Sequence, residues 1–174
     1  DPAVVLPRVL TEIRQIIPAE AGSVTLLEPD GETLRVVSDF GFDETQVGFR
    51  IPVAGSVNGE IIQSRRTLWI GNIFDAEQAG RSYPAAASVA SRMRNTLGAP
   101  LIVAGKAIGT LYLVHSQANI FTARDAERLE RYAAQVAIAV SNARLYEQIQ
   151  SQVAQLRHLN TDLEVANQHK SEFL

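Results

Sequence analysis

The stretch Leu97–Leu111 reads LGAPLIVAGKAIGTL and contains the clearest β-hairpin signal in the sequence. The apolar run Leu97–Val103 predicts one strand, the turn residues Ala104–Lys106 follow it, and Ala107–Val114 predicts the returning strand. Gly109 lies inside the second strand, where a glycine indicates a bulge or the close approach of another backbone. The stretch therefore predicts antiparallel strand pairing.

Upstream of this hairpin, the sequence predicts helices and further strands. Apolar residues at helical spacing, ended by Pro18, predict a first amphipathic helix. Pro29-Asp30-Gly31 is a strong turn signal between two strands. The other predicted elements are strands Gly22–Glu28, Thr33–Ser38 and Arg66–Ile70, an edge segment Phe49–Val53, a short helix capped by Ser56, and a region of mostly loop and weak helix, Asn72–Asn95.

Downstream of the hairpin, the sequence predicts one long helix. Thr122 is its expected N-cap, with Asp125 at the third helical position in place of the usual Glu or Gln of a capping box. From Ala123 to about Lys170 there is no Pro and no Gly. At about 1.5 Å per residue, such a helix is about 70 Å long.

This helix carries two apolar stripes. The first consists of Leu129, Ala133, Val136 and Val140, and its spacing fits packing against the domain's own sheet. The second stripe alternates steps of three and four residues, which is the pattern of a coiled-coil seam. The seam residues are Tyr146, Ile149, Val153, Leu156, Asn160, Leu163 and Asn167.

The seam contains polar residues that weaken it. Asn160 and Asn167 both fall at a positions, where asparagine fixes the register and favours a parallel dimer at a cost in stability. A marginal seam suits a helix that shifts between two packings. It is equally compatible with a simple spacer.

The composition excludes several classes of function. The chain has 174 residues, 16 of them basic and 19 acidic, for a net charge of -3, so nucleic-acid binding has no electrostatic support. No apolar run reaches the about 18 residues of a membrane span. The absence of cysteine excludes disulfides, thiolate zinc sites and cysteine nucleophiles. His115, His158 and His169 are too scattered to suggest a metal site, and no nucleophile–base pair or phosphate-binding glycine loop indicates an enzyme.

Several motifs in order resemble the GAF domain family. The hairpin quoted above is similar to the central hairpin of that family. The matching segments elsewhere are Ile51–Val53 through Gly59 to Asn72-Ile73, Phe121-Thr122 with Asp125 and Leu129, Ala133–Ala139, and Asn142–Tyr146. The resemblance covers about Ala3 to Tyr146. It implies a layered α+β fold, with a GAF-like central antiparallel sheet of about six strands flanked by helices and a long C-terminal coiled-coil helix.

The end of the chain resembles another family. Residues 167–174, NQHKSEFL, are similar to the opening of the dimerisation and phosphotransfer domain of histidine kinases. In that family the run continues to a histidine followed by an acidic residue, Leu, Arg, Thr and Pro. His169 is followed by Lys170, so we do not expect it to be the phosphoacceptor. The chain lacks an initial Met and stops in mid-pattern, and we therefore expect a fragment of a longer protein.

These resemblances predict three segments. They are a GAF domain (residues 1–144), a signalling coiled-coil helix (145–166) and the truncated start of the phosphotransfer domain (167–174). The GAF resemblance also implies a pocket between the sheet and the loops covering it, and we expect the region Asn72–Asn95 and the loop around Gly55 to be lids.

The candidate pocket residues fall into two chemical classes. The aromatic and apolar candidates are Phe49, Trp69, Ile73, Tyr83, Met93 and Tyr112. Arg81, Arg92 and Arg94 are candidates for holding an anionic ligand. The competing interpretation is ordinary core packing for the first class and a solvated surface for the arginines. We expect no catalytic residue and no metal ligand.

The resemblance leaves the cofactor unknown but excludes some options. A cysteine-linked bilin is impossible without cysteine, and the methionine sulfoxide reductases of this family need cysteine chemistry. Phe121 and Asp125 match part of a cyclic-nucleotide motif, but Ala126 replaces its Glu and helix capping explains both residues.

The favoured hypothesis is a regulatory sensor and dimerisation module of a cytoplasmic two-component sensor histidine kinase. The fragment itself would catalyse nothing. It would form a homodimer through its N- and C-terminal helices and pass a small-molecule or conformational signal to a downstream kinase domain and its response regulator. The alternative is a ligand-free structural dimerisation GAF module in a signalling protein.

Overall fold

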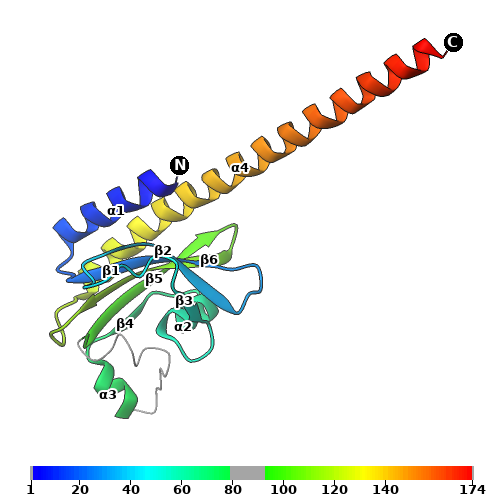
Figure 1. Cartoon of the computed structure of the whole chain (residues 1–174). Helices are drawn as coiled ribbons and strands as arrows, with labels where there is room; N and C mark the ends of the chain where they lie inside the picture. Colours follow the sequence, from blue (N-terminus) through cyan, green and yellow to red (C-terminus); the bar gives the residue numbers. More distant parts are fainter. Residues whose placement is uncertain (1, 79–92, 174) are drawn as a thin grey trace. The chain divides into compact units, whose positions relative to one another are not determined.

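The computed structural model describes residues 2–78 and 93–173 (Figure 1). The chain divides into two compact units, Asp1–Ala139 and Val140–Leu174. The helices are α1 (Pro2–Ile16), α2 (Val57–Ser64), α3 (Ile73–Gln78) and α4 (Ala123–Glu172), and the strands are β1 (Ala21–Leu27), β2 (Thr33–Phe40), β3 (Arg50–Pro52), β4 (Leu68–Ile70), β5 (Asn95–Val103) and β6 (Lys106–His115). Among the described residues, no helix combines the length and apolarity needed to cross a bilayer.

The six described strands form one antiparallel sheet in the order β3-β2-β1-β6-β5-β4. The predicted hairpin is confirmed as β5 and β6, in which Leu97 pairs with Leu113. A side-chain carbon at Gly109 would overlap the Thr25 carbonyl oxygen of β1, so the predicted close approach is confirmed too. This glycine lets β6 pair with β1 along its length, which places β6 and β1 at the centre of the sheet.

The two faces of the sheet are covered by different helices. α1 and the part of α4 up to Ala139 lie on one face, and α2 lies on the other (Figure 1). The buried residues on the first face include Leu6, Leu10 and Ile13 of α1, Ile17 directly after it, and Leu129, Ala133 and Val136 of α4. Since α2 has only eight residues, the second face depends on loops for the rest of its cover.

The short helix α2 is held by its caps. Ser56 is the N-cap, as predicted, and its Oγ accepts a hydrogen bond from the Gly59 backbone N–H at 2.9 Å. Gly59 has no room for a side chain, because a Cβ there would overlap the Val53 carbonyl group. The buried residues Val57 and Ile61 then pack with Ile70 and Ile73. The cap and this cluster fix α2 against β5 and β6.

The start of α4 is also fixed by hydrogen bonds. Asp125 accepts from the Thr122 N–H at 2.9 Å and from the Thr122 hydroxyl at 2.7 Å, which confirms the variant capping box. Asn95 of β5 is fully buried, and its Oδ1 accepts from the N–H groups of Ile120 and Phe121, both at 2.8 Å. Its Nδ2 donates to the Ile70 carbonyl at 2.6 Å. One side chain therefore joins β4, β5 and the segment that leads into α4.

Some boundaries differ from the sequence predictions. β5 begins at Asn95 rather than Leu97, and β4 begins at Leu68 rather than Arg66. The short helix α3 lies inside the region predicted to be loop and weak helix, in agreement with that prediction. The shift in β5 has a clear cause, because Asn95 and Thr96 are polar residues that the fold buries and the hydrophobic pattern therefore missed them.

Glu20 joins the start of β1 to the end of β6. Its carboxylate accepts from the Ser116 hydroxyl at 2.7 Å and from the Ser116 N–H at 3.0 Å, and it lies 3.5 Å from His115 Nε2. The Ser116 side-chain hydrogen bond is the largest cause that lowers the pKa of Glu20 below its usual 4.5. The side chain of His115 is mostly buried, with 15% of it exposed.

The lowered pKa of Glu20 predicts a pH-dependent contribution to stability. A carboxylate whose pKa is lower in the folded than in the unfolded state stabilises the fold at pH values above the unfolded pKa. This stabilisation is lost as the pH falls through the folded pKa. We expect Glu20→Gln to lower the free energy of unfolding at pH 7 by about 0.5–1 kcal/mol, since solvent screens this part-exposed group. Urea unfolding should show the difference shrinking as the pH falls below 4.5 and Glu20 becomes protonated, while Glu127→Gln, at an exposed position, changes little. An equal loss above and below pH 4.5 would contradict the assignment.

Candidate functional site

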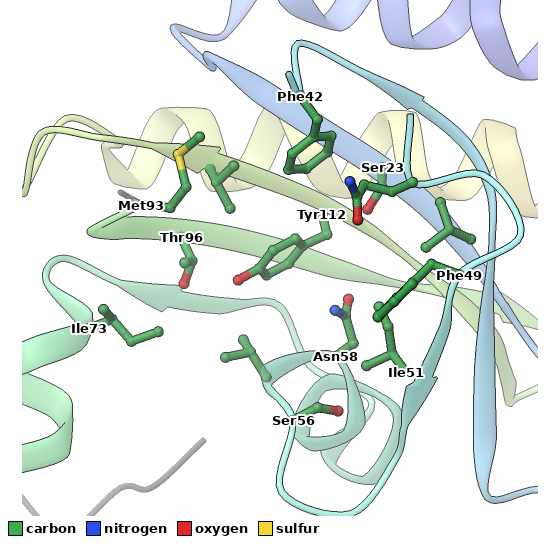
Figure 2. Close-up of a pocket in the computed structure, with 14 residues that line it drawn as sticks. Ser23, Phe42, Phe49, Ile51, Ser56, Asn58, Ile73, Met93, Thr96 and Tyr112 are labelled. Atoms are coloured by element: carbon green, nitrogen blue, oxygen red, sulfur yellow. The ribbon is translucent and has the colours of Figure 1, made fainter. Parts of the chain in front are cut away.

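A cavity lies on the α2 side of the sheet, between α2, the central strands and the loop after β2 (Figure 2). The space inside that the centres of water molecules can reach is about 80 Å³. One water needs about 10–15 Å³ in this measure, so the cavity has room for on the order of five waters or one small organic molecule. Its described lining residues are Ser23, Val36, Phe42, Gln46, Phe49, Ile51, Ser56, Val57, Asn58, Ile73, Met93, Thr96, Tyr112 and Val114.

The outer wall of the cavity is mostly apolar. Phe42 and Phe49 come from the loop between β2 and β3, and Ile51 follows on β3 itself. Phe49 is 53% exposed, although it lines the cavity. The loop 41–49 therefore covers the cavity from outside. The predicted lids also reach the cavity, since Ser56 lies next to Gly55, and Ile73 and Met93 belong to the region Asn72–Asn95. Residues 79–92 of that region lie outside the described residues.

The inner wall is the sheet itself, and it presents hydroxyl groups beside Val36 and Val114. Successive side chains of a strand point to opposite faces. Ser23 of β1, Thr96 of β5 and Tyr112 of β6 line the cavity (Figure 2), whereas the neighbouring Leu97 and Leu111 are fully buried in the core. Strands that look apolar overall thus present hydroxyl groups to one face.

A buried hydroxyl relay connects this face of the sheet to α2. The Thr110 hydroxyl donates to Asn58 Oδ1 at 2.7 Å. Because its single proton is used there, the Thr25 hydroxyl, 2.7 Å away, donates to Thr110 Oγ1. The relay holds the Asn58 oxygen against the sheet and leaves the amide nitrogen on the Tyr112 side of the cavity (Figure 2).

Thr96 differs from the other buried threonines. It is 2% exposed, and its Oγ1 has no hydrogen-bond partner among the described residues. A buried hydroxyl without a partner costs free energy, so native proteins rarely retain one without a reason such as a bound ligand. Thr96 lines the cavity, and Figure 2 shows its oxygen on the cavity side of β5. A molecule in the cavity is therefore within reach of this group.

The described lining residues include no Asp, Glu, Lys, Arg or His. Arg94 lies outside the cavity, exposed, with its guanidinium carbon 5.4 Å from the Phe74 ring centroid. Trp69 of β4 is 43% exposed and is not a lining residue. Among the described residues there is also no group of three or more side chains that could hold a metal ion. The described part of the wall thus offers neutral hydrogen bonds and apolar contact.

The sequence predictions and the structure agree for part of the site. Phe49, Ile73, Met93 and Tyr112 are brought together around the cavity, and Trp69 and Arg94 are not. Tyr83, Arg81 and Arg92 lie outside the described residues. The sequence analysis missed Phe42 and Gln46 of the loop and the polar residues Ser23, Asn58 and Thr96. A signal for the polar residues was present in the sequence, because hydroxyl side chains inside apolar strands occur at every second position, as expected for residues on one face of a sheet.

The second unit is the C-terminal part of α4, and it presents the predicted seam to solvent. The apolar seam residues are 41–69% exposed: Tyr146, Ile149, Val153, Leu156 and Leu163. Asn160 and Asn167 are exposed as well. Two further leucines, Leu145 and Leu159, are 52% and 58% exposed, and each directly precedes a seam residue at heptad position a. This helix therefore carries a wider apolar stripe than the sequence analysis described.

The two cavity-face threonines give a matched test of these contacts. Thr110→Val removes the centre of the relay, leaving the Thr25 and Asn58 groups unpaired, and should lower the free energy of unfolding by about 1–3 kcal/mol. Thr96→Val removes a hydroxyl that has no partner, and should be neutral or stabilising by up to about 1 kcal/mol. Urea unfolding of both variants measures the contrast. A Thr96→Val loss as large as that of Thr110→Val would contradict the account.

Comparison with known proteins gives the family of the chain. A family model described as GAF domain matches residues 1–141. No curated protein matches the chain. The GAF domain of a phosphoenolpyruvate-protein phosphotransferase from Acinetobacter is 16% identical, with a TM-score of 0.72, over 83% of this chain and 85% of that one.

Two other solved structures show how widely this fold is used. The GAF-B domain of DevS from Mycobacterium smegmatis is 22% identical, with a TM-score of 0.66, over 86% of this chain and 99% of that one. The free methionine-R-sulfoxide reductase of Neisseria meningitidis is 20% identical, with a TM-score of 0.70, over 84% of this chain and 81% of that one. At these identities the likeness shows the fold alone. The family model covers the sheet and the cavity, and the chain therefore belongs to the GAF domain family of signalling and sensor modules.

Proposed function

We propose that this chain is the regulatory sensor and dimerisation module of a cytoplasmic two-component sensor histidine kinase. A small molecule in the GAF cavity would bias how α4 packs in a parallel homodimer, and α4 would pass that bias to a kinase domain. The observation that carries the proposal is the continuity of α4, which starts inside the GAF unit and runs on as a 50-residue helix with an exposed heptad stripe.

The cavity and the start of α4 are connected within the first unit. Thr96 lines the cavity, and its neighbour Asn95 holds the N–H groups of Ile120 and Phe121. Phe121 directly precedes the cap residue Thr122. A shift of β5 on ligand binding would therefore act on the segment from which α4 begins. Such a coupling requires that the ligand prefers one of two states, because equal affinity for both shifts nothing.

The exposed stripe on α4 supports two packings rather than one. The first seam runs through Tyr146, Val153, Asn160 and Asn167. It shares Ile149, Leu156 and Leu163 with a second seam, which runs through Leu145, Gln152, Leu159 and Ala166. Successive residues of a helix are about 100° apart around its axis. The two seams share one line of residues and differ by one position in the other, so exchanging the seams rotates each helix by half of this angle, about 50°. A helix with two overlapping seams can carry a two-state signal.

The partner that fits this stripe is a second copy of the chain. The three-and-four alternation continues over the shared seam, and asparagine at a positions is the feature that favours parallel pairing in register. The proposed dimer also places the N-terminal helices α1 near the same axis, as we expected from the sequence. The alternative, a ligand-free dimerisation module, fits less well with a cavity that contains an unpartnered buried hydroxyl.

The kinase role is supported by the C-terminal resemblance to a dimerisation and phosphotransfer domain over residues 167–174. In α4 these residues continue the helix without interruption to Glu172. In a histidine kinase, the phosphoacceptor helix follows such a signalling helix directly. The downstream partners of the proposal are therefore a kinase domain in the same protein and a response regulator.

The dimer part of the proposal predicts a loss of association when the shared seam is charged. Leu156→Asp would place a carboxylate in the seam without a partner, and light scattering should then show a monomer in place of the dimer. Ser151→Asp, on the outer side of the helix, should leave the dimer intact. Both residues are exposed in the single chain, so circular dichroism should show an unchanged fold. A monomeric parent chain would contradict the proposal.

The kinase part predicts what the complete gene encodes. Beyond Leu174 it should continue to a histidine followed by an acidic residue, Leu, Arg, Thr and Pro, and then to an ATP-binding kinase domain. The complete protein should then incorporate acid-labile phosphate from ATP, as expected for phosphohistidine. A stop codon or an unrelated domain at this point would refute the kinase role and leave the GAF family assignment standing.

A further inference from the structure

We propose that the cavity binds an uncharged molecule that has a largely apolar body and a carbonyl group. This inference rests on the proposed ligand-binding function and names the chemical class of the ligand. It differs from the expectation of an anionic ligand that the arginine-rich region of the sequence suggested.

The first observation is the absence of fixed charge. No described lining residue is an acid, a base or a histidine, and the sheet-side wall is buried. A charged ligand in such surroundings loses its hydration without gaining an ion partner, which is strongly unfavourable. Arg94, the described arginine that had been expected to bind an anion, stacks over Phe74 outside the cavity. The described wall therefore selects against carboxylates, phosphates and ammonium groups.

The second observation is the set of polar groups that remain for a ligand. Thr96 Oγ1 is buried and has no partner among the described residues. The Asn58 oxygen is occupied by the Thr110 hydroxyl, and its amide nitrogen is turned toward the cavity (Figure 2). Both Thr96 and Asn58 can donate to an acceptor. A carbonyl oxygen, which only accepts, is therefore a suitable partner for either side chain.

The third observation is the apolar remainder of the wall. Phe42, Phe49 and Ile51 form the outer side, and Ile73 and Met93 lie at the end near β5 (Figure 2). The room inside corresponds to on the order of five waters, or about 150 Å³ of liquid volume, and a buried cavity of about that size accepts a benzene ring. One ring with one polar substituent is therefore the size of ligand that the described cavity accommodates.

Four probes of similar shape separate charge, hydrogen bonding and apolar contact. Benzamide is neutral with a carbonyl, benzoate is an anion, benzylamine is a cation at pH 7, and toluene has no hydrogen-bonding group. We would titrate each into the whole chain and follow its two-dimensional NMR spectrum. We expect benzamide to shift the signals of Thr96 and of the Asn58 side-chain amide, with benzoate and benzylamine at least about tenfold weaker because of charge burial.

Thr96→Val tests the hydrogen bond directly. It keeps the shape of the side chain. It should lower the affinity for benzamide about 3- to 10-fold, as expected for one neutral hydrogen bond, and leave the affinity for toluene unchanged. Thr33→Val, in β2 and outside the cavity lining, is the control and should change neither affinity. Since Thr96→Val is not expected to unfold the protein, a loss of binding would report the contact itself.

Each other outcome overturns a defined part of the proposal. Benzoate binding as tightly as benzamide would overturn the neutral class while leaving the cavity as a ligand site. An unchanged benzamide affinity in Thr96→Val would overturn the role of this hydroxyl. Binding of none of the probes would overturn the proposed ligand class together with ligand sensing. The dimer and the downstream kinase would still be judged by their own separate measurements.

Discussion

A six-stranded sheet has two faces that must both be removed from water, and the helices of this chain cover them unequally. α1 and the first part of α4 supply a continuous set of buried aliphatic residues for one face. Among the described residues, the cover of the other face consists of the eight residues of α2, its capping loop, the loop 41–49, and Ile73 and Met93. Most of the functional features follow from this inequality, because the incompletely covered face is where the cavity lies.

Buried hydrogen bonds on that face help a loosely covered surface to remain part of a stable fold. Here Thr25, Thr110 and Asn58 satisfy each other through the relay, which fastens α2 to the sheet without filling the space beside it. Thr96 is the exception, and its unpaired hydroxyl marks the place where the protein alone does not complete its own hydrogen bonding.

Much of the fold could be predicted from the sequence, because its signals are local. The hairpin around Ala104–Lys106, the Ser56 cap and the Thr122–Asp125 box depend on turn and capping chemistry that acts within a few residues. The candidate site was harder to predict. Phe49, Ile73, Met93 and Tyr112 were found because aromatic and apolar residues near loops are natural candidates. Ser23 and Thr96 were missed, because only the register of β1, β5 and β6 shows that they share one face.

The same reasoning explains why two of the candidates lie elsewhere. Trp69 is on the edge strand β4, where one side of the chain faces solvent, and Arg94 is held by its backbone, which donates to the His115 carbonyl at 2.9 Å. The wider apolar stripe of α4 was also missed, since a heptad frame chosen for one seam leaves Leu145 and Leu159 unassigned. Both leucines are exposed in the single chain, and this exposure indicates that they can form a second seam.

The central claim is that filling the cavity changes which seam of α4 is used in the dimer. The chain has no cysteine, so single-cysteine variants cross-link without background. Val153→Cys reports the first seam and Leu159→Cys the second, and disulfide formation would be followed with and without benzamide. The account predicts that both variants cross-link and that benzamide raises one rate while lowering the other. Cross-linking at Val153→Cys alone, with a rate that benzamide binding leaves unchanged, would contradict it.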